Sequence, residues 1–233
     1  MRIFKNINEE NRKMFLQNAL SAIPSGSSIL DAGAGELKNK QYCSHLKYTS
    51  QDFCEYKGLA GSSVNQGLQM ETWDTSGIDL VSDITHIPVE NESFDVVLCS
   101  EVLEHIPDPT KALDEFRRIL KFDGVLILTA PFASNVHFAP YHFSSGFSKY
   151  WYEHHLEARK FNILELSPNG DWYDVLRQEL GRLGALERAK RNPVWPLAYA
   201  YSLLGCLYFS LRKKINADDL ACFGWHCIAK KRC

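Results

Sequence analysis

The sequence predicts an α/β fold in which an open, doubly wound parallel sheet holds a ligand at one edge, and three observations predict it. Four short apolar runs of strand length each end in a polar residue. Helical segments or loops separate these runs, as they do in parallel sheets. The first run, residues 28–32, leads into Gly33 and Gly35, a spacing typical of a tight nucleotide-cradling turn. We therefore expect a ligand across the carboxyl ends of the strands.

Length and composition predict an ordinary globular protein. The chain has 233 residues, enough to bury a full core, and we expect a single domain over residues 1–233. A formal charge of -2 gives no field that would attract nucleic acid or an anionic membrane. Seven cysteines without a C-x-x-C pair favour reduced thiols, and residues 1–15 lack the apolar stretch of an export signal. We expect a cytoplasmic location.

The N-terminal part alternates helix and strand. A flanking helix is expected within residues 7–23, ended by Pro24 and Gly26, and it either lids the ligand site or simply packs on the sheet. After the first strand we expect a short helix over 38–46. A second strand over 48–51 ends at Asp52.

The residues around the glycine turn indicate what binds there. A dinucleotide fingerprint would need a third glycine at Lys38, and Glu36 would place a negative charge where a pyrophosphate lies. Both residues oppose a nicotinamide dehydrogenase. Asp31, at the end of the strand, suits a ligand that is cationic or carries hydroxyl groups.

The motif of Asp31, Gly33 and Gly35 resembles the first motif, D/E-x-G-x-G-x-G, of the class I S-adenosylmethionine-dependent methyltransferases, with Leu37 in place of the third glycine. The resemblance implies a Rossmann-like, seven-stranded, mostly parallel sheet with an antiparallel last strand. It also implies S-adenosylmethionine as cofactor, held in part by these three residues.

Further cofactor residues follow from the resemblance. Asp52, about 20 residues beyond Asp31, is the expected ribose-binding acid, with Phe53 beside it. A third strand over 79–84 ends near Asp83 and Ile84, which match the adenine-binding pair; the alternative is that Asp83 is only a turn residue. The connection over 53–77 shows no helical pattern and is long enough to have a function, such as folding over the ligand.

The most family-specific string is EVLEHIPDP, residues 101–109, which follows a strand over 93–100. It resembles the exit of the fourth strand in small-molecule methyltransferases, including the quinone O-methyltransferases, and implies that Ser100 and Glu101 contact the cofactor. A helix capped by Asp108 runs to about residue 121, residues 122–124 turn, and a fifth strand spans 125–130.

The acceptor side is expected in residues 137–155, which hold half of the eight histidines and many aromatic residues. A helix capped by Ser144 or Ser148 follows. His105 and His142 are the candidate general bases, since imidazole titrates in the useful range, although His105 could instead fix its loop.

Glu101, Glu104 and His105 also resemble an E-x-x-E-H metal site of certain RNA 2'-O-methyltransferases, with His142 as a later ligand. Because the same string is widespread in methyltransferases without a metal, we expect none here. No basic and aromatic surface indicates nucleic acid.

The last third is expected to hold a sixth strand over 161–166, a turn at 168–170, a helical insertion over about 171–215 that begins at Asp171, and a last strand over 221–229. Residues 194–211 carry no charge and have basic flanks. As a helix of about 27 Å they are short for a hydrocarbon core of about 30 Å. Pocket wall, homodimer interface and in-plane membrane contact remain as alternatives.

The sequence therefore predicts a methyltransferase that acts on a small or lipid-linked acceptor, most simply at oxygen. The competing hypothesis is a non-catalytic module that binds S-adenosylmethionine. The sequence does not predict which acceptor is used.

Overall fold

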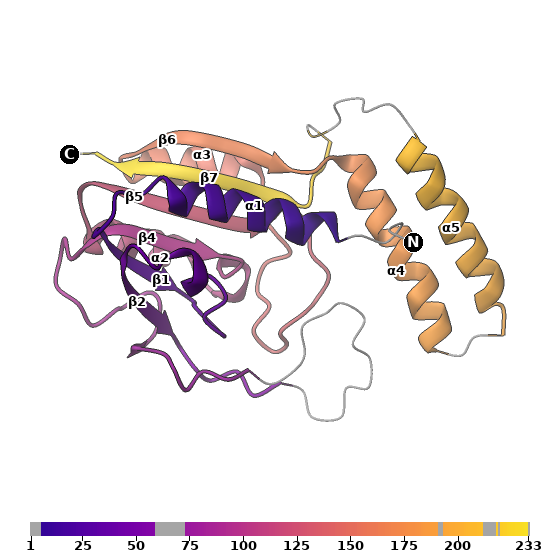
Figure 1. Ribbon diagram of the computed structural model, residues 1–233, viewed down its shortest axis with the longest axis horizontal. Coiled ribbons are helices and arrows are strands. Elements are labelled where there is room, and N and C mark those ends of the chain that lie inside the picture. Colours follow the sequence, from indigo (N-terminus) through magenta and orange to yellow (C-terminus); the bar gives the residue numbers. More distant parts are fainter. Residues whose placement is uncertain (1–5, 59–72, 191–192, 212–217, 219, 233) are drawn as a thin grey trace.

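The computed structural model describes residues 6–58, 73–190, 193–211, 218 and 220–232. These residues form a seven-stranded sheet (Figure 1). From edge to edge the strands are β3 (Leu80–Val81), β2 (Lys47–Asp52), β1 (Ser28–Ala32), β4 (Phe94–Ser100), β5 (Leu120–Pro131), β7 (Gly224–Lys231) and β6 (Phe161–Asn169). Strand β7 is antiparallel to β5 and β6, and the other pairs are parallel. The predicted sheet, with its antiparallel last strand, is confirmed.

Helices cover both faces of the sheet because the central strands are apolar on both sides. Helix α1 (Ile7–Ser21) lies across one face, and α2 (Pro109–Ile119) and α3 (Lys149–Ala158) cover the other (Figure 1). Leu20 of α1 and Phe116 of α2 are fully buried, in two separate core clusters. The strand order reverses at β1, and a ligand crevice is expected at the carboxyl ends of the strands beside such a reversal.

Side-chain caps begin the helices where the sequence predicted. Asp108 accepts a hydrogen bond from the Thr110 amide at α2, and Asp171 caps the helix that follows β6. Ser148, rather than Ser144, caps α3 by accepting from the Trp151 amide.

Two elements predicted in the first half of the chain, a helix and a strand, are shorter than the sequence predicted. The helix expected over 38–46 is only a 3₁₀ turn, Lys40–Tyr42. Its N-cap, Asn39, makes no capping bond; its amide lies 3.5 Å from the Asp31 carboxylate instead. The third strand is two residues long, Leu80–Val81, and just before it the Asp79 carboxylate accepts from the Ser50 amide of β2.

Two predicted turns are instead parts of strands. Residues 122–124 belong to β5, where Asp123 has a φ of 62° and the pairing with β4 shifts register. Pro168 belongs to β6 and pairs with Trp225. Proline is tolerated there because β6 is an edge strand with one unpaired side. Residues 59–72 of the long connection lie outside the described residues, and the flanks 53–58 and 73–77 contain no helix or strand.

Helices α4 (Trp172–Ala189) and α5 (Trp195–Leu211) lie side by side beyond one end of the sheet (Figure 1). Buried Ser202 and Cys206 of α5 face α4, where a Cβ added at Gly184 would lie 3.0 Å from the Ser202 hydroxyl. The outer face of α5 is exposed at large apolar residues: Leu197, Tyr201, Leu204, Leu207, Tyr208 and Leu211. Among the described residues, nothing covers this face as the wall of a closed pocket would be covered. Within the described residues, no helix has both the length and the apolarity to cross a membrane.

Candidate active site

The glycine turn after β1 has the geometry that its residues predicted. Gly33 and Gly35 have φ values of 76° and 51°, which favour glycine. A Cβ at Gly33 would lie 2.5 Å from a Val102 methyl, and one at Gly35 would lie 2.6 Å from the Trp73 ring. Leu37, which replaces the third glycine, still has a left-handed φ of 58°. The turn thus keeps a left-handed path at the position where this sequence departs from the family motif.

The carboxylate of Asp52 fastens this turn to the end of β2. It is only 5% exposed; one oxygen accepts from the Gly35 amide at 2.9 Å, and the other accepts from the Cys54 amide at 2.9 Å. Each oxygen has a second lone pair that these bonds leave free. Asp52 is thus a fixed, buried carboxylate that two hydroxyl groups could still reach, as a ribose would require. Phe53, the next residue, makes an edge contact with Tyr141 at 5.0 Å between ring centroids.

Asp31 lies deeper than Asp52. Its carboxylate is 1% exposed and accepts from the Tyr48 hydroxyl at 2.8 Å. Burial raises its pKa to about 6, although the hydrogen bonds from Tyr48 and Asn39 act in the opposite direction. The sequence alone offered no signal for Tyr48 as a partner.

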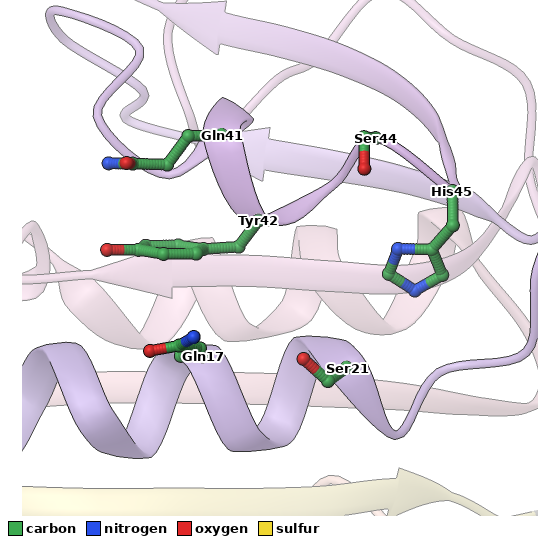
Figure 2. A pocket seen from close by; sticks show the side chains of 6 residues that line it. All are labelled: Gln17, Ser21, Gln41, Tyr42, Ser44 and His45. Carbon is green, nitrogen blue, oxygen red and sulfur yellow. The ribbon is translucent and has the colours of Figure 1, made fainter.

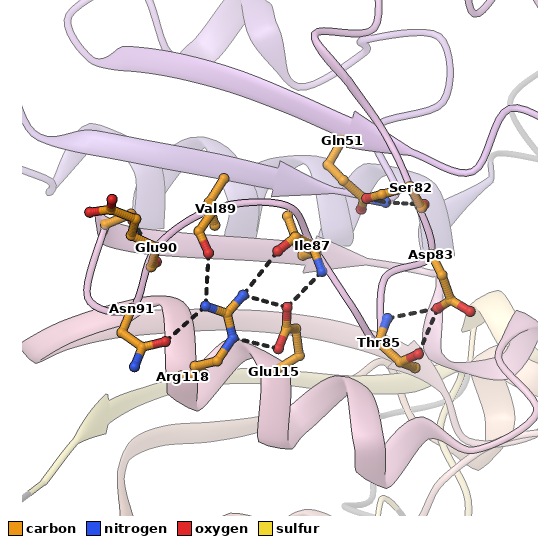
Figure 3. A network of polar contacts seen from close by, with 11 residues as sticks. Gln51, Ser82, Asp83, Thr85, Ile87, Val89, Glu90, Asn91, Glu115 and Arg118 are labelled. Atoms are coloured by element: carbon orange, nitrogen blue, oxygen red, sulfur yellow. Dashed lines mark hydrogen bonds and ion pairs between the residues drawn. The ribbon is translucent and has the colours of Figure 1, made fainter.

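The predicted adenine-binding pair follows β3. One oxygen of Asp83 accepts from both the amide and the hydroxyl of Thr85, at 2.7 and 2.8 Å, as a turn residue does (Figure 3). The side chain of Ile84, the other member of the pair, is buried in the core. The contacts within the protein thus give Asp83 the role of a turn residue, and its second oxygen is the one that faces away from Thr85 (Figure 3).

An ion pair on α2 between buried Glu115 and half-buried Arg118 fixes the loop that carries Asp83. Arg118 donates to the carbonyl oxygens of Ile87 and Val89 at 2.9 and 2.8 Å and pairs with Glu115 at 2.7 Å (Figure 3). Glu115 in turn accepts from the Ile87 amide at 2.6 Å. Burial alone would raise the pKa of Glu115, but these hydrogen bonds lower it overall.

At the end of β4, Ser100 and Glu101 are joined through β5. The Ser100 hydroxyl lies 2.8 Å from that of Thr129, which donates to Glu101 at 2.9 Å. Arg12 of α1 completes the chain with an ion pair to Glu101 at 2.9 Å. Helix α1 therefore both packs on the sheet and contributes a charge to this edge, a role that sequence patterns did not predict for Arg12.

Three histidines lie close together beyond the ends of β4 and β5, on the side where the methyl acceptor is expected. His105 follows β4, while His137 and His142 follow β5, and one ring nitrogen of each lies within 4.8 Å of the others. The Glu104 carboxylate, 1% exposed, lies below them at 3.7 Å from His105 Nε2. Burial lowers the pKa of His105 to about 4 and raises that of Glu104 well above its usual value. The sequence located the histidine-rich stretch but did not single out His137.

Aromatic rings connect the two halves of the edge. Phe138 stacks on Tyr56 with centroids 4.0 Å apart, contacts Trp73 at 4.3 Å, and lies 4.8 Å from the His105 ring. They form an apolar wall between the glycine turn and the histidines.

A separate polar groove of about 310 Å³ lies between α1 and the segment after the glycine turn (Figure 2). Its lining residues are Gln17, Ser21, Gln41, Tyr42, Ser44 and His45. None of the predicted site residues lines it, so it has no part in the site described above.

A glycine turn followed by acids at the carboxyl edge of such a sheet is the arrangement in which α/β proteins bind nucleosides. Two family models, each described as a methyltransferase domain, match residues 30–128 and 80–178. The chain belongs to the class I S-adenosylmethionine-dependent methyltransferases, as the sequence predicted.

Curated relatives match over short segments. The ubiquinone biosynthesis O-methyltransferase of Haemophilus ducreyi is 39% identical over 67 residues, which is 29% of this chain and 28% of that protein. The protein of the same name from Xanthomonas axonopodis pv. citri is 31% identical over 110 residues, 46% of this chain and 44% of that protein. The chain thus matches less than half the length of either relative.

Solved structures with the same fold match over nearly the whole chain. The cyclase SpnF has a TM-score of 0.58 at 16% identity and covers 95% of this chain and 81% of its own. Phosphoethanolamine N-methyltransferase 2 of Haemonchus contortus, in complex with S-adenosyl-L-methionine, has a TM-score of 0.53 at 17% identity and covers 95% of this chain and 52% of its own. At such identities the likeness shows the fold alone.

Proposed function

We propose that this protein transfers the methyl group of S-adenosylmethionine to an oxygen atom of a small-molecule or lipid-linked acceptor. The observation that carries the proposal is the buried Asp52 carboxylate, held at the glycine turn with lone pairs left for a ribose. The named O-methyltransferases among the relatives support oxygen as the methylated atom.

The cofactor would lie across the carboxyl ends of β1, β2 and β4. Gly33 and Gly35 allow its amino-acid part to approach the backbone, and Asp52 accepts from the ribose hydroxyls. The remaining proposed cofactor contacts are Asp31, Phe53, Asp83, Ile84, Ser100 and Glu101.

Methyl transfer from a sulfonium is an in-line displacement, so holding the acceptor close to the methyl group supplies much of the acceleration, up to about 7–11 kcal/mol. Residues of this chain would then take the acceptor's hydroxyl proton. His105 and His142 are the proposed bases, because burial lowers the pKa of both and keeps them neutral near pH 7. The aromatic wall excludes water from this side.

The exposed apolar face of α5 supports a lipid-linked acceptor. Its large residues recur at helical spacing on one side of the helix, and four of them are more than 60% exposed: Leu197, Tyr201, Leu204 and Leu211. Such a face lies well in the interface of a membrane, where a lipid-linked substrate would be met. The alternative is that two copies of the chain form a homodimer through the same face.

The proposal is tested by incubating the protein with methyl-labelled S-adenosylmethionine and matched acceptors: a phenol, its lipid-linked form, the corresponding amine, and a short RNA. We expect label in the phenol or its lipid-linked form and none with Asp52→Ala. Label only in the amine or the RNA would overturn the proposal. Cofactor binding without label in any acceptor would favour the non-catalytic module.

A further inference from the structure

Three imidazoles and a carboxylate converge beyond the ends of β4 and β5. The ring nitrogens of His105, His137 and His142 that face one another lie within 4.8 Å. The loop carrying His142 is tied down beside Glu104, whose carbonyl oxygen accepts from the amides of Phe143 and Ser144 at 2.9 and 3.2 Å. The cluster is therefore held by the fold and is not a chance meeting of surface side chains.

Backbone carbonyls set the tautomer of two of these histidines. His105 Nδ1 lies 2.6 Å from the Tyr141 carbonyl oxygen, and His137 Nδ1 lies 2.9 Å from that of Asn135. A carbonyl oxygen only accepts, so each Nδ1 carries the hydrogen. Each Nε2 therefore presents a lone pair, which is the arrangement that orients histidines as metal ligands.

The Glu104 carboxylate lies against these lone pairs. Its Oε1 is 3.7 Å from His105 Nε2 and 3.9 Å from His137 Nε2. Glu104 is 1% exposed, and neither of its oxygens has a hydrogen-bond partner among the described residues. The two ring nitrogens of His142 are buried and likewise without a hydrogen bond to any described residue. The Glu104 Oε1 and the Nε2 lone pairs of His105 and His137 thus face one another without a hydrogen bond between them, which is costly where such groups are buried.

We propose that these groups bind a divalent metal ion of the zinc class, with His105 Nε2, His137 Nε2, a ring nitrogen of His142 and the Glu104 carboxylate as ligands. A cation between the four groups gives a partner to one nitrogen of each imidazole and to one oxygen of Glu104. Imidazole nitrogen with one carboxylate suits zinc or a similar transition metal better than magnesium. Tetrahedral bonds of about 2.1 Å place nitrogens about 3.4 Å apart, so nitrogens that lie up to 4.8 Å apart need to approach by up to about 1.4 Å. This departs from the sequence-based expectation of no metal.

The role of the ion rests on the proposed function. Next to the acceptor side, it would bind the acceptor oxygen and lower its pKa, so that the hydroxyl proton passes to solvent water. With the ion bound, His105 and His142 act as its ligands and no longer as the bases that the metal-free site would use. Metal binding itself does not depend on the acceptor or on methyl transfer, and it is measured separately.

The test uses the untagged protein, stripped with a chelator and titrated with Co²⁺, with visible absorption and metal analysis as readouts. The variants are His137→Ala and Glu104→Gln, and the control is His154→Ala, which changes an exposed histidine on α3. We expect one ion per chain for the wild type and the control, and an affinity at least about tenfold weaker for both site variants. Equal binding by His137→Ala and the wild type would overturn the proposal, as would a wild type without stoichiometric binding, which would indicate a protonated Glu104 instead.

Titration of the same samples with S-adenosylhomocysteine separates the causes of failure. A variant that loses the metal but still binds S-adenosylhomocysteine is folded, and its loss counts for the metal site. Metal binding by a wild type that does not bind S-adenosylhomocysteine would overturn the proposed function and leave the metal site standing.

Discussion

The two halves of the carboxyl edge of the sheet differ in whether the protein itself supplies hydrogen-bond partners for their buried polar side chains. Around β1 and β2, Asp31 accepts from Tyr48, and Asp52 accepts from two backbone amides. Beyond β4 and β5, the Glu104 carboxylate and both nitrogens of His142 have no hydrogen-bond partner among the described residues. The first half is organised before its ligand arrives. The second half needs a proton, a metal ion or a substrate to complete it.

This difference indicates which half of the site lowers the stability of the unliganded protein. Pre-formed hydrogen bonds in the first half leave little to reorganise when the cofactor binds. The acceptor half instead holds buried polar groups that lower stability until a partner binds.

The largest effect is expected at Asp31, the deepest acid of the first half. Its folded pKa of about 6 lies above the ordinary value of 3.8, so its contribution to stability is full below about pH 4 and is lost as the pH rises through 6. An asparagine at this position does not titrate and can still accept from Tyr48. We therefore expect Asp31→Asn to be more stable than the wild type by on the order of 3 kcal/mol above pH 7, with the gap shrinking as the pH falls.

Urea unfolding of both proteins between pH about 5 and about 8 measures this gap. Asp123→Asn is the control, because its side chain is 57% exposed and its left-handed backbone suits asparagine. A gap that does not change with pH would contradict the account of Asp31.

The next effect is expected at the ion pair that fixes the Asp83 loop. Glu115→Gln removes the charge that accepts from Arg118 and from the Ile87 amide, at a cost of about 2 kcal/mol. Glu179→Gln is the matched control, since Glu179 also pairs with an arginine three residues later but is 44% exposed. Urea unfolding of the two variants should differ clearly; equal losses would show that burial of the pair does not matter.

The smallest effect is expected on α5. Leu204→Glu places a charge in the middle of the exposed apolar face and should weaken co-sedimentation with anionic vesicles about tenfold. Met14→Glu, at a residue of α1 that is 60% exposed, should not. If neither the wild type nor the variants pellet, and only Leu204→Glu fails to elute as a dimer, the face is a homodimer interface instead.

Local patterns predicted the first half of the edge well, and long-range contacts explain the rest. The Gly33 turn and the strand ending at Asp52 follow from a few adjacent residues. His137 joins His105 only through tertiary structure, since the two residues follow different strands. The same holds for Arg12 of α1, which pairs with Glu101 although the two residues are far apart in the sequence. The helix expected over 38–46 was wrong: the segment forms only a 3₁₀ turn, which Asn39 does not cap, and the Asn39 side-chain Nδ2 lies 3.5 Å from the Asp31 carboxylate.

Calorimetric titration with S-adenosylhomocysteine, for the wild type and Asp52→Asn, tests the central claim most directly. The asparagine keeps the shape of the site and an acceptor for the Gly35 amide, but it loses the charge that binds the ribose hydroxyls. We expect saturable binding by the wild type and binding about ten- to a hundredfold weaker by the variant. Equal affinities, or no binding by the wild type, would contradict the account.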